Sequence, residues 1–304
     1  MVPRPLSGVS EGFLESCAAH IGWALVGVKT QVLFLYCRDP ASGFCAECAD
    51  KANLVSLVTE LRAKLGKDKL ITIASQASMP HTLGGFDLVK LQDQIDWFNV
   101  MTYDYTVSDS EQANVTAANQ PIFNTSNPNV RDPWGMAYTL DGYAAAGVDP
   151  SKISMGIALY GHTWYVPGLQ GDSWKKFGLE ATVQNACCGP WGLTYGAAAG
   201  SGCQLCGTMM FSEIRAAGCS SFLDEETFSH ISYCEEDSAD GHTKAGTWIS
   251  WNDYASLMMM FKWGAYKKLR GVFIFDTSQD TLDTNGTFTY EYTKNISGEV
   301  RAWT

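Results

Sequence analysis

Residues 94–105 are rich in aromatic and β-branched side chains, and the pattern predicts a strand that is largely apolar and buried on both faces. Alternate side chains of a strand share a face. One face carries Trp97, Asn99, Met101 and Tyr103, and the other carries Phe98, Val100 and Thr102. Asp104 follows where the strand ends, and the carboxyl ends of parallel strands are where α/β proteins build their sites. The pattern predicts a site at Asp104 or, as the plainer alternative, a core strand followed by an acid in a turn.

The rest of the chain alternates helix-like and strand-like patterns at short intervals. Helices are predicted at residues 11–22, 51–64, 86–93, 136–146 and 254–268. Strands are predicted at residues 70–76, 96–103, 153–160 and 272–275, with one or two more in residues 23–36. This alternation is typical of parallel βα units. A long polar loop interrupts it at residues 108–133, and Gly-rich and Cys-rich segments at residues 161–247 indicate an insertion.

Composition narrows the class of partner. The chain has 304 residues, of which 46% are hydrophobic and 17% charged, as in a globular protein with a sizeable core. Its formal net charge of −11 argues against nucleic acid and against an anionic membrane, because phosphate binding needs basic patches. A neutral substrate is compatible with that charge. No apolar run approaches the roughly 18 residues of a membrane span, and the first residues lack the apolar stretch of a signal peptide.

Ten cysteines are many for a protein in a reducing compartment. They fall into two groups along the chain, which favours disulfides. The alternative is a zinc site made from the Cys-x-x-Cys motifs at residues 45–48 and 203–206, but these lie much farther apart than in a zinc ribbon. Four glycosylation sequons also favour secretion, and they begin at Asn114, Asn124, Asn285 and Asn295. We therefore expect an extracellular or secretory-pathway protein whose signal peptide is absent from this chain.

Five segments, in order, resemble parts of one enzyme family. Residues 101–104 resemble the end of its sixth barrel strand, residues 152–161 its seventh strand and residues 269–276 its eighth. Residues 53–62 resemble the helix that follows its fourth strand, and residues 247–253 resemble the end of its inserted subdomain. Taken together, the segments are similar to glycoside hydrolase family 18, the chitinases and chitinase-like lectins.

The resemblance implies an α/β fold of the (β/α)8 TIM barrel type, with an α+β subdomain inserted between the seventh and eighth strands. The first three strands have no counterpart, so the barrel is expected to be incomplete at its N-terminus. We expect the barrel in residues 1–160 and 248–304 and the subdomain in residues 161–247. Members of the family hydrolyse β-1,4 links between N-acetylglucosamine units with retention. The implied partner is chitin or a chito-oligosaccharide, bound by a monomer that uses no cofactor and no metal.

The resemblance also implies roles for individual residues. In this family a glutamic acid ending the fourth strand protonates the leaving oxygen, and the acetamido oxygen of the substrate is the nucleophile, an exception to the two-carboxylate scheme. By position, Tyr103 would hydrogen-bond the acetamide, Asp104 would orient the sugar and Met101 would line the floor. Phe275 would take the place of a stacking tryptophan. Two further candidates for substrate binding lie at the mouths of the fifth and seventh strands, Gln76 and Tyr160.

The segment that corresponds to the family's fourth strand lacks the acidic residues on which the family's chemistry depends. Tyr36 aligns with the tyrosine that follows the catalytic glutamate, so Leu35 stands in place of the acid. The positions of the family's aspartates hold Val28, Gln31 and Leu33. Leucine cannot donate a proton, and losing a general acid costs about 10²- to 10⁴-fold in rate. Either the chain is a genuine non-hydrolytic relative, or the sequence is truncated or misassembled; we favour the second, because three strands and four acids are missing together.

The sequence therefore predicts a chitinase-type glycoside hydrolase that is catalytically impaired as written. The alternative is a lectin-like pseudoenzyme that binds chitin without cleaving it. Trp134 and Trp164 are further candidates for sugar platforms. His162 is expected to be a hydrogen-bonded surface or core histidine rather than a base, and the acids at residue 213 and residues 224–226 are expected on the solvated surface of the insertion.

Overall fold

The computed structural model describes residues 22–25, 30–34, 50–106, 115–130, 134–181, 207–239, 243–281 and 289–300. Residues 11–21 of the expected helix, both Cys-x-x-Cys motifs and Leu35 lie outside these ranges, and Gly22, where that helix was expected to end, begins a strand instead. The α-helices are α2 (Asp50–Leu65), α3 (Met79–Gly85), α4 (Leu88–Gln92), α5 (Met136–Ala145), α6 (Phe211–Ala217), α7 (Tyr254–Tyr266) and α8 (Glu291–Val300). The 3-10 helices are η2 (Pro150–Lys152), η3 (Gly171–Trp174) and η4 (Thr277–Gln279).

Two sheets contain the strands of this part of the chain. The first sheet has the strand order β1-β2-β3-β4-β5-β11, and its members are β1 (Gly22–Leu25), β2 (Thr30–Phe34), β3 (Leu70–Gln76), β4 (Trp97–Met101), β5 (Ile153–Ala158) and β11 (Gly271–Phe275). The second sheet has the order β7-β6-β10-β9-β8, and its members are β6 (Tyr160–Tyr165), β7 (Thr208–Met210), β8 (Ser220–Asp224), β9 (Ser229–Tyr233) and β10 (Thr247–Trp251).

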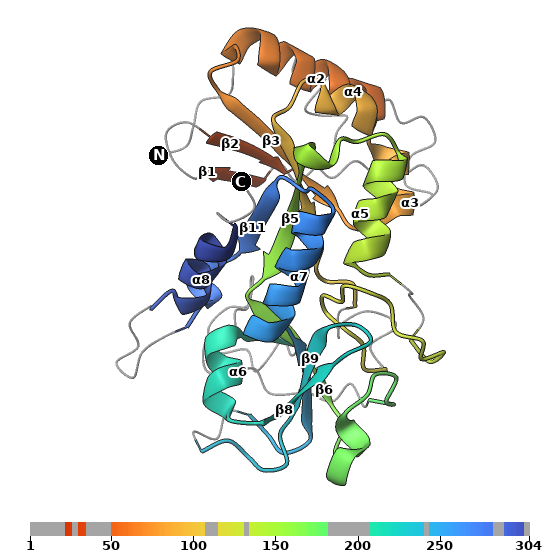
Figure 1. Ribbon diagram of the computed structural model, residues 1–304, viewed down its shortest axis with the longest axis vertical. Helices are drawn as coiled ribbons and strands as arrows, with labels where there is room; N and C mark the ends of the chain where they lie inside the picture. The colour runs from red at the N-terminus through yellow and green to blue at the C-terminus, as the bar shows by residue number, and fades with distance from the viewer. Residues whose placement is uncertain are drawn as a thin grey trace.

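Strands β2, β3, β4, β5 and β11 of the first sheet are parallel and follow one another in chain order. Only β1 is antiparallel to its neighbour β2. Helix α2 connects β2 to β3, α3 and α4 connect β3 to β4, and α5 connects β4 to β5. This βα succession confirms the α/β class and places five strands in the order expected for one side of a barrel. Figure 1 shows α7 crossing in front of β5, with α5 beside it.

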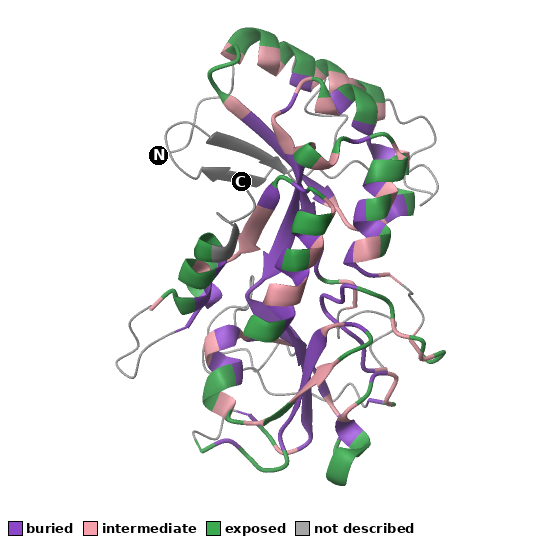
Figure 2. Ribbon diagram, in the orientation of Figure 1, coloured by how far each residue is buried: buried purple, intermediate pink, exposed green. Residues whose placement is uncertain are grey.

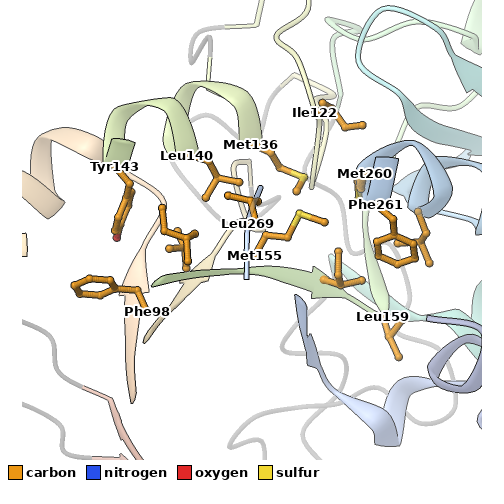
Figure 3. Close-up of a cluster of buried hydrophobic side chains, with 14 of the residues drawn as sticks. Phe98, Ile122, Met136, Leu140, Tyr143, Met155, Leu159, Met260, Phe261 and Leu269 are labelled. Carbon is orange, nitrogen blue, oxygen red and sulfur yellow. The ribbon is translucent and has the colours of Figure 1, made fainter. Parts of the chain in front are cut away.

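The core between this sheet and its helices explains why β4 is apolar on both faces. Phe98 and Val100 on β4 and Met155 on β5 are each 0% exposed. Figure 3 shows side chains of α5, including Leu140 and Tyr143, meeting those of β4 and β5. Each such side chain contributes about 1.5–3 kcal/mol by its burial. The two-sided burial predicted for this strand is therefore confirmed.

The second sheet lies between β5 and β11 in the chain, as expected for the insertion. All its pairings are antiparallel, and α6 follows β7. Figure 2 shows β6 and its neighbours as a second buried layer at the lower end of the molecule. Cys219 and Cys234 form a disulfide across the edge of this sheet, which confirms that at least one pair of cysteines is oxidised. The other eight cysteines lie outside the described ranges.

The first boundary expected between barrel and insertion falls close to a strand end, whereas the second, between residues 247 and 248, falls inside β10 of the second sheet. The strand expected at residues 153–160 ends at Ala158, and Tyr160 begins β6, which pairs with β7 and β10 instead. The residue between them, Leu159, is fully buried and its N–H donates to the carbonyl of Phe275. The chain therefore passes from one sheet to the other within two residues. The division into residues 1–160, 161–247 and 248–304 stays a prediction.

Several other helices and strands predicted from the sequence are present, with small differences in where they begin and end. The helix expected at residues 51–64 is α2, and the strand at residues 70–76 is β3. The short helix expected at residues 86–93 is α4, preceded by an unexpected α3. Within the described ranges no helix is long and apolar enough to cross a membrane. The sequon residues Asn124 and Asn295 are exposed.

Candidate functional site

The candidate site lies at the carboxyl ends of the parallel strands. Gln76 ends β3, Met101 ends β4 directly opposite it, and Phe275 ends β11. Asp104 follows β4 after a short irregular stretch, and Tyr160 follows the end of β5. All the substrate-binding residues expected from the sequence therefore come from one edge of the sheet, where α/β folds build their sites. Gln76 belongs to this group because it is paired in register with Met101 on the neighbouring strand.

Tyr103 is the centre of an aromatic cluster at this edge. Its ring centroid lies 6.1 Å from that of Tyr160, 6.2 Å from that of Phe273 and 5.9 Å from that of Phe275. The contacts with Tyr160 and Phe273 are edge-to-face, an arrangement that contributes about 0.5–1.5 kcal/mol per pair beyond burial. Met101 packs against the same cluster. Tyr103 is only 8% exposed, whereas Phe275 is partly exposed and offers an apolar surface at the edge.

Gly156 makes room for this cluster. It lies in β5 between β4 and β11. A Cβ atom added there would lie 2.7 Å from Tyr103 Cε1, 2.9 Å from Phe273 Cζ and 2.9 Å from the carbonyl oxygen of Val100. These distances are far shorter than a van der Waals contact. The absence of a side chain at this position therefore lets the two rings pack over the strand.

Two side chains hold Asp104 through the same carboxylate oxygen. The Tyr160 hydroxyl donates to Oδ1 at 2.6 Å, and Nε2 of His162 lies 2.8 Å from the same oxygen. Neither bond uses Oδ2, and the side chain is 45% exposed. The backbone of Asp104 is left-handed, with φ of 58°, a conformation that Asp tolerates better than most residues. The carboxylate is therefore held through Oδ1 on a side chain that is partly exposed.

The surroundings of Asp104 set its charge and those of its neighbours. Burial raises the pKa of Asp104, but the hydrogen bond and positive charge of His162 and the hydrogen bond from Tyr160 outweigh it and lower the pKa below its usual range. Burial, together with the charges of Asp104 and Asp276, raises the pKa of Tyr103. Burial and the charge of Asp104 also raise the pKa of Tyr160. The site is therefore a fixed carboxylate beside two neutral phenols.

His162 is the main functional residue that the sequence did not indicate. It is a buried, hydrogen-bonded residue as expected, but its partner is Asp104. Its other ring nitrogen, Nδ1, lies 3.0 Å from the carbonyl oxygen of Gly207. Tyr160 and His162 are two positions apart on β6 and share a face, which brings both donors to the same oxygen. That alternation was the available signal, but the partner lies 58 residues away in the chain.

A loop between β4 and α5 fixes the backbone around Asp104. Asn119 Oδ1 accepts from the N–H of Asp104 at 3.0 Å, and Asn119 Nδ2 donates to the carbonyl of Tyr160 at 3.2 Å. Gln120 Nε2 donates to the carbonyl of Thr102 at 2.6 Å, and its Oε1 accepts from the N–H of Ala158 at 3.1 Å. Asn119 and Gln120 are both 0% exposed. These two amides join the ends of the first sheet and the start of the second.

Other residues singled out in the sequence lie apart from this site. Trp164 is 3% exposed and packs edge-to-face on Trp248, so it is a core residue and offers no platform. Trp134 is partly exposed and stacks on Tyr138. Glu213 was expected on the solvated surface but is 7% exposed, and it accepts from the N–H of Met210 at the start of α6, which corrects that expectation.

The arrangement can bind and orient a polar ligand with an apolar face. A carboxylate oxygen accepts hydrogen bonds from hydroxyl or amide groups, and aromatic side chains cover C–H faces. Asp104 is poorly suited to donate a proton, because its lowered pKa keeps it ionised near neutral pH. The described residues contain no group of three or more His, Cys, Asp or Glu side chains that could hold a metal ion.

Comparisons with known proteins agree on one family. Residues 33–280 match the sequence model of Glycosyl hydrolases family 18. Chitinase A1 of Niallia circulans is 32% identical over 127 residues, covering 38% of this chain and 18% of the relative. The chitinase-like protein Idgf3 of Drosophila simulans is 24% identical over 236 residues, covering 76% of this chain and 52% of the relative. The chain thus spans about half or less of the length of these curated relatives.

The fold also matches a solved structure. Human YKL-39, solved in the presence of chitooligosaccharides, superposes with a TM-score of 0.70 at 16% sequence identity. The match covers 90% of this chain and 69% of that one. YKL-39 is described as a pseudo-chitinase with retained chitooligosaccharide binding properties. At this level of identity the likeness establishes the fold, an α/β barrel type with an antiparallel insertion.

Proposed function

Because the chain belongs to glycosyl hydrolase family 18, we propose that it binds chito-oligosaccharides at the carboxyl ends of β4, β5 and β11. One observation carries this proposal: Asp104 is bonded to the protein through Oδ1, and its side chain is 45% exposed beside the aromatic cluster of Tyr103 and Phe275. A sugar amide or hydroxyl would donate to Oδ2, while a pyranose face would rest on the cluster. The net charge of −11 is compatible with a neutral sugar.

The six residues expected to bind substrate have different roles in this proposal. Asp104 orients the sugar and Tyr103 hydrogen-bonds its acetamide group. Tyr160 holds the carboxylate in place through its hydroxyl. The residues that line the floor and the rim are Gln76, Met101 and Phe275. The likeness to YKL-39 supports binding without requiring hydrolysis, since that protein is described as binding chitooligosaccharides as a pseudo-chitinase.

We also propose that this chain does not hydrolyse what it binds. Leu35, aligned with the catalytic glutamate, has no proton to give, and the pKa of Asp104 is lowered, so that carboxylate does not replace the missing acid. The second candidate function is chitin hydrolysis, favoured by the 32% identity to chitinase A1. An Asp-x-x-Asp-x-Asp-x-Glu reading across residues 20–40 of the transcript would support that second candidate.

Isothermal titration of the full chain with tetra-N-acetylchitotetraose tests the binding proposal. We expect saturable binding that is weakened about 10- to 100-fold in Asp104→Asn, which keeps the shape but places an amide at Oδ2. The matched control is Asp172→Asn, which makes the same charge change at an exposed position in η3 and should bind as the unaltered chain does. Equal affinity of both variants, or no binding by the unaltered chain, would overturn the proposal.

Hydrolysis is tested on the same samples. Chromatography of the oligosaccharide after prolonged incubation should recover the tetrasaccharide intact while the titration shows binding. Shorter oligosaccharides that appear in proportion to protein concentration would refute the proposed loss of catalysis. That result would leave the binding site itself unaffected, because orientation by Asp104 is needed for both functions.

A further inference from the structure

We propose that His162 controls the affinity of Asp104 for an N-acetyl sugar, so that binding weakens as the imidazole ring loses its proton. The inference rests on the proposed binding function and adds a regulating residue to it. His162 is a positioning residue, since it contacts the carboxylate on the oxygen that faces the protein.

The bonds from His162 to Asp104 and to Gly207 use both ring protons when they are made together. Nε2 lies 2.8 Å from Oδ1 of Asp104, and Nδ1 lies 3.0 Å from the carbonyl oxygen of Gly207. An ionised carboxylate and a carbonyl are both acceptors only, so each nitrogen must donate. A neutral imidazole carries one N–H and must give up one of the two bonds. Only the protonated ring donates to both acceptors. In the neutral ring that keeps its proton on Nε2, Nδ1 can accept from Oγ1 of Thr208, which lies 3.4 Å away, and the carbonyl of Gly207 keeps the bond that it accepts from the N–H of Thr163.

Few other groups near His162 can compensate for its charge. Its side chain is 7% exposed. Across the sheet it pairs in register with Thr208 on β7 and Ser250 on β10, neither of which is ionisable. Along β6 it contacts the rings of Tyr160 and Trp164. Among the described residues packed around it, the titratable groups are therefore Asp104 and Tyr160, and the raised pKa keeps Tyr160 neutral.

The position of the proton decides how well Asp104 is prepared for a ligand. With His162 protonated, Tyr160 and His162 both donate to Oδ1, and the carboxylate is fixed through that oxygen. Loss of the proton turns the charge-assisted bond to Oδ1 into a weaker neutral bond when Nε2 keeps its hydrogen, and it breaks that bond when Nδ1 keeps its hydrogen instead. The carboxylate must then be ordered by the ligand, which lowers the affinity. By linkage, bound sugar favours the protonated ring.

The test is a pH series from about pH 5 to 9, the range in which imidazole changes charge. Titration with tetra-N-acetylchitotetraose gives the affinity, and NMR of the ring C–H signals of His162 gives the fraction protonated in the same buffers. We expect the affinity to fall about 10-fold with a midpoint that coincides with that of the ring signals. The ring signals should also titrate at higher pH when the sugar is bound.

Two variants separate the role of His162 from general effects of pH. His162→Gln keeps a donor but cannot take a charge, so its binding should be weak and independent of pH. The control His81→Gln removes an exposed imidazole from α3 and should keep the pH profile of the unaltered chain. Thermal unfolding of each variant checks that it is folded.

The outcomes distinguish this inference from the proposed function. Absence of sugar binding at every pH would overturn the proposed function itself. Binding that is present but does not change with pH, or a fall that persists in a folded His162→Gln variant, would overturn the control by His162 and leave the binding site intact. If His162→Gln proves unfolded, a mismatch between the affinity midpoint and the His162 ring signals still refutes the inference.

Discussion

Replacing Gly156 by alanine should loosen both the fold and the candidate site. The backbone there is an ordinary strand, so space alone decides the effect. The new methyl group would lie 2.7 Å from Tyr103 Cε1 and 2.9 Å from both Phe273 Cζ and the carbonyl oxygen of Val100. The rings can shift, but the carbonyl oxygen is part of β4 and cannot move without disturbing the strand. The substitution therefore displaces the aromatic cluster.

The size of the effect follows from two opposing contributions. Overpacking of this kind costs about 1–3 kcal/mol, and removing the glycine from a strand returns about 0.5–1 kcal/mol. The free energy of unfolding should therefore fall, by up to about 2.5 kcal/mol. Affinity for chito-oligosaccharide should fall as well, because Tyr103 can no longer occupy its place beside Asp104.

Urea unfolding followed by tryptophan fluorescence measures the stability, and titration calorimetry measures the affinity. The matched control is Gly298→Ala in α8, where an added Cβ meets no atom within 4 Å. That change should leave the free energy of unfolding unaltered or raise it by up to about 1 kcal/mol. If Gly156→Ala were as stable as the control and bound the sugar equally well, the packing argument for the site would be wrong.

Four other predictions concern the contacts around the carboxylate and the disulfide. Asn119→Ala leaves buried backbone groups unpaired and should lower the free energy of unfolding by about 1–3 kcal/mol in urea titrations, while a stability equal to that of the unaltered chain would contradict this role. Tyr160→Phe removes a bond to the carboxylate, so NMR titration should find the pKa of Asp104 raised relative to the unaltered chain; an unchanged value would refute the assignment. The folded-state pKa of Asp104 is lowered, so its contribution to stability is complete above its unfolded pKa of about 4 and is lost as the pH falls through the lower folded value. In acid unfolding experiments, the free energy of unfolding of Asp104→Asn should therefore depend less on pH than that of the unaltered chain. Replacing Cys219 and Cys234 by serine opens a loop with a sequence separation of 15 and should cost about 3 kcal/mol; a melting temperature equal to that of the oxidised chain would show that the bond adds no stability.

The parts of the fold that follow from local pattern were predictable. β4 was identified because its apolar residues occupy both faces, and α2 because its apolar residues recur at helical spacing. α3 was missed because Pro80 and two glycines look like a turn, although proline is well suited to the first turn of a helix. Tyr160 was assigned to the end of β5 because the apolar run continues through Leu159, whereas pairing with β7 and β10 decides where the strand ends.

The residues expected at the candidate site do lie at one edge of the first sheet, but the bonds among them and the additional contacts of His162 and Asn119 could not be predicted. Asp104 could be named because it follows the end of a predicted parallel strand, whereas Tyr103 and Phe275 were named because the resemblance to the family implied them. The contact of His162 with Asp104 depends on how β6 leaves the first sheet after Ala158, which no local pattern encodes. The role of Asn119 depends in the same way on a loop that crosses between the two sheets. Contacts between distant segments are fixed by tertiary packing, and a single sequence does not reveal them.

A crystal structure of the full chain with tetra-N-acetylchitotetraose would test the central claim most directly. The account predicts an intact tetrasaccharide at the carboxyl ends of β4, β5 and β11, with an amide or hydroxyl donor within hydrogen-bonding distance of Asp104 Oδ2. It also predicts that Tyr160 and His162 keep their bonds to Oδ1 and that a sugar ring rests on Phe275. A ligand bound elsewhere on the chain, or one that displaces Tyr160 or His162 from Oδ1, would contradict the account.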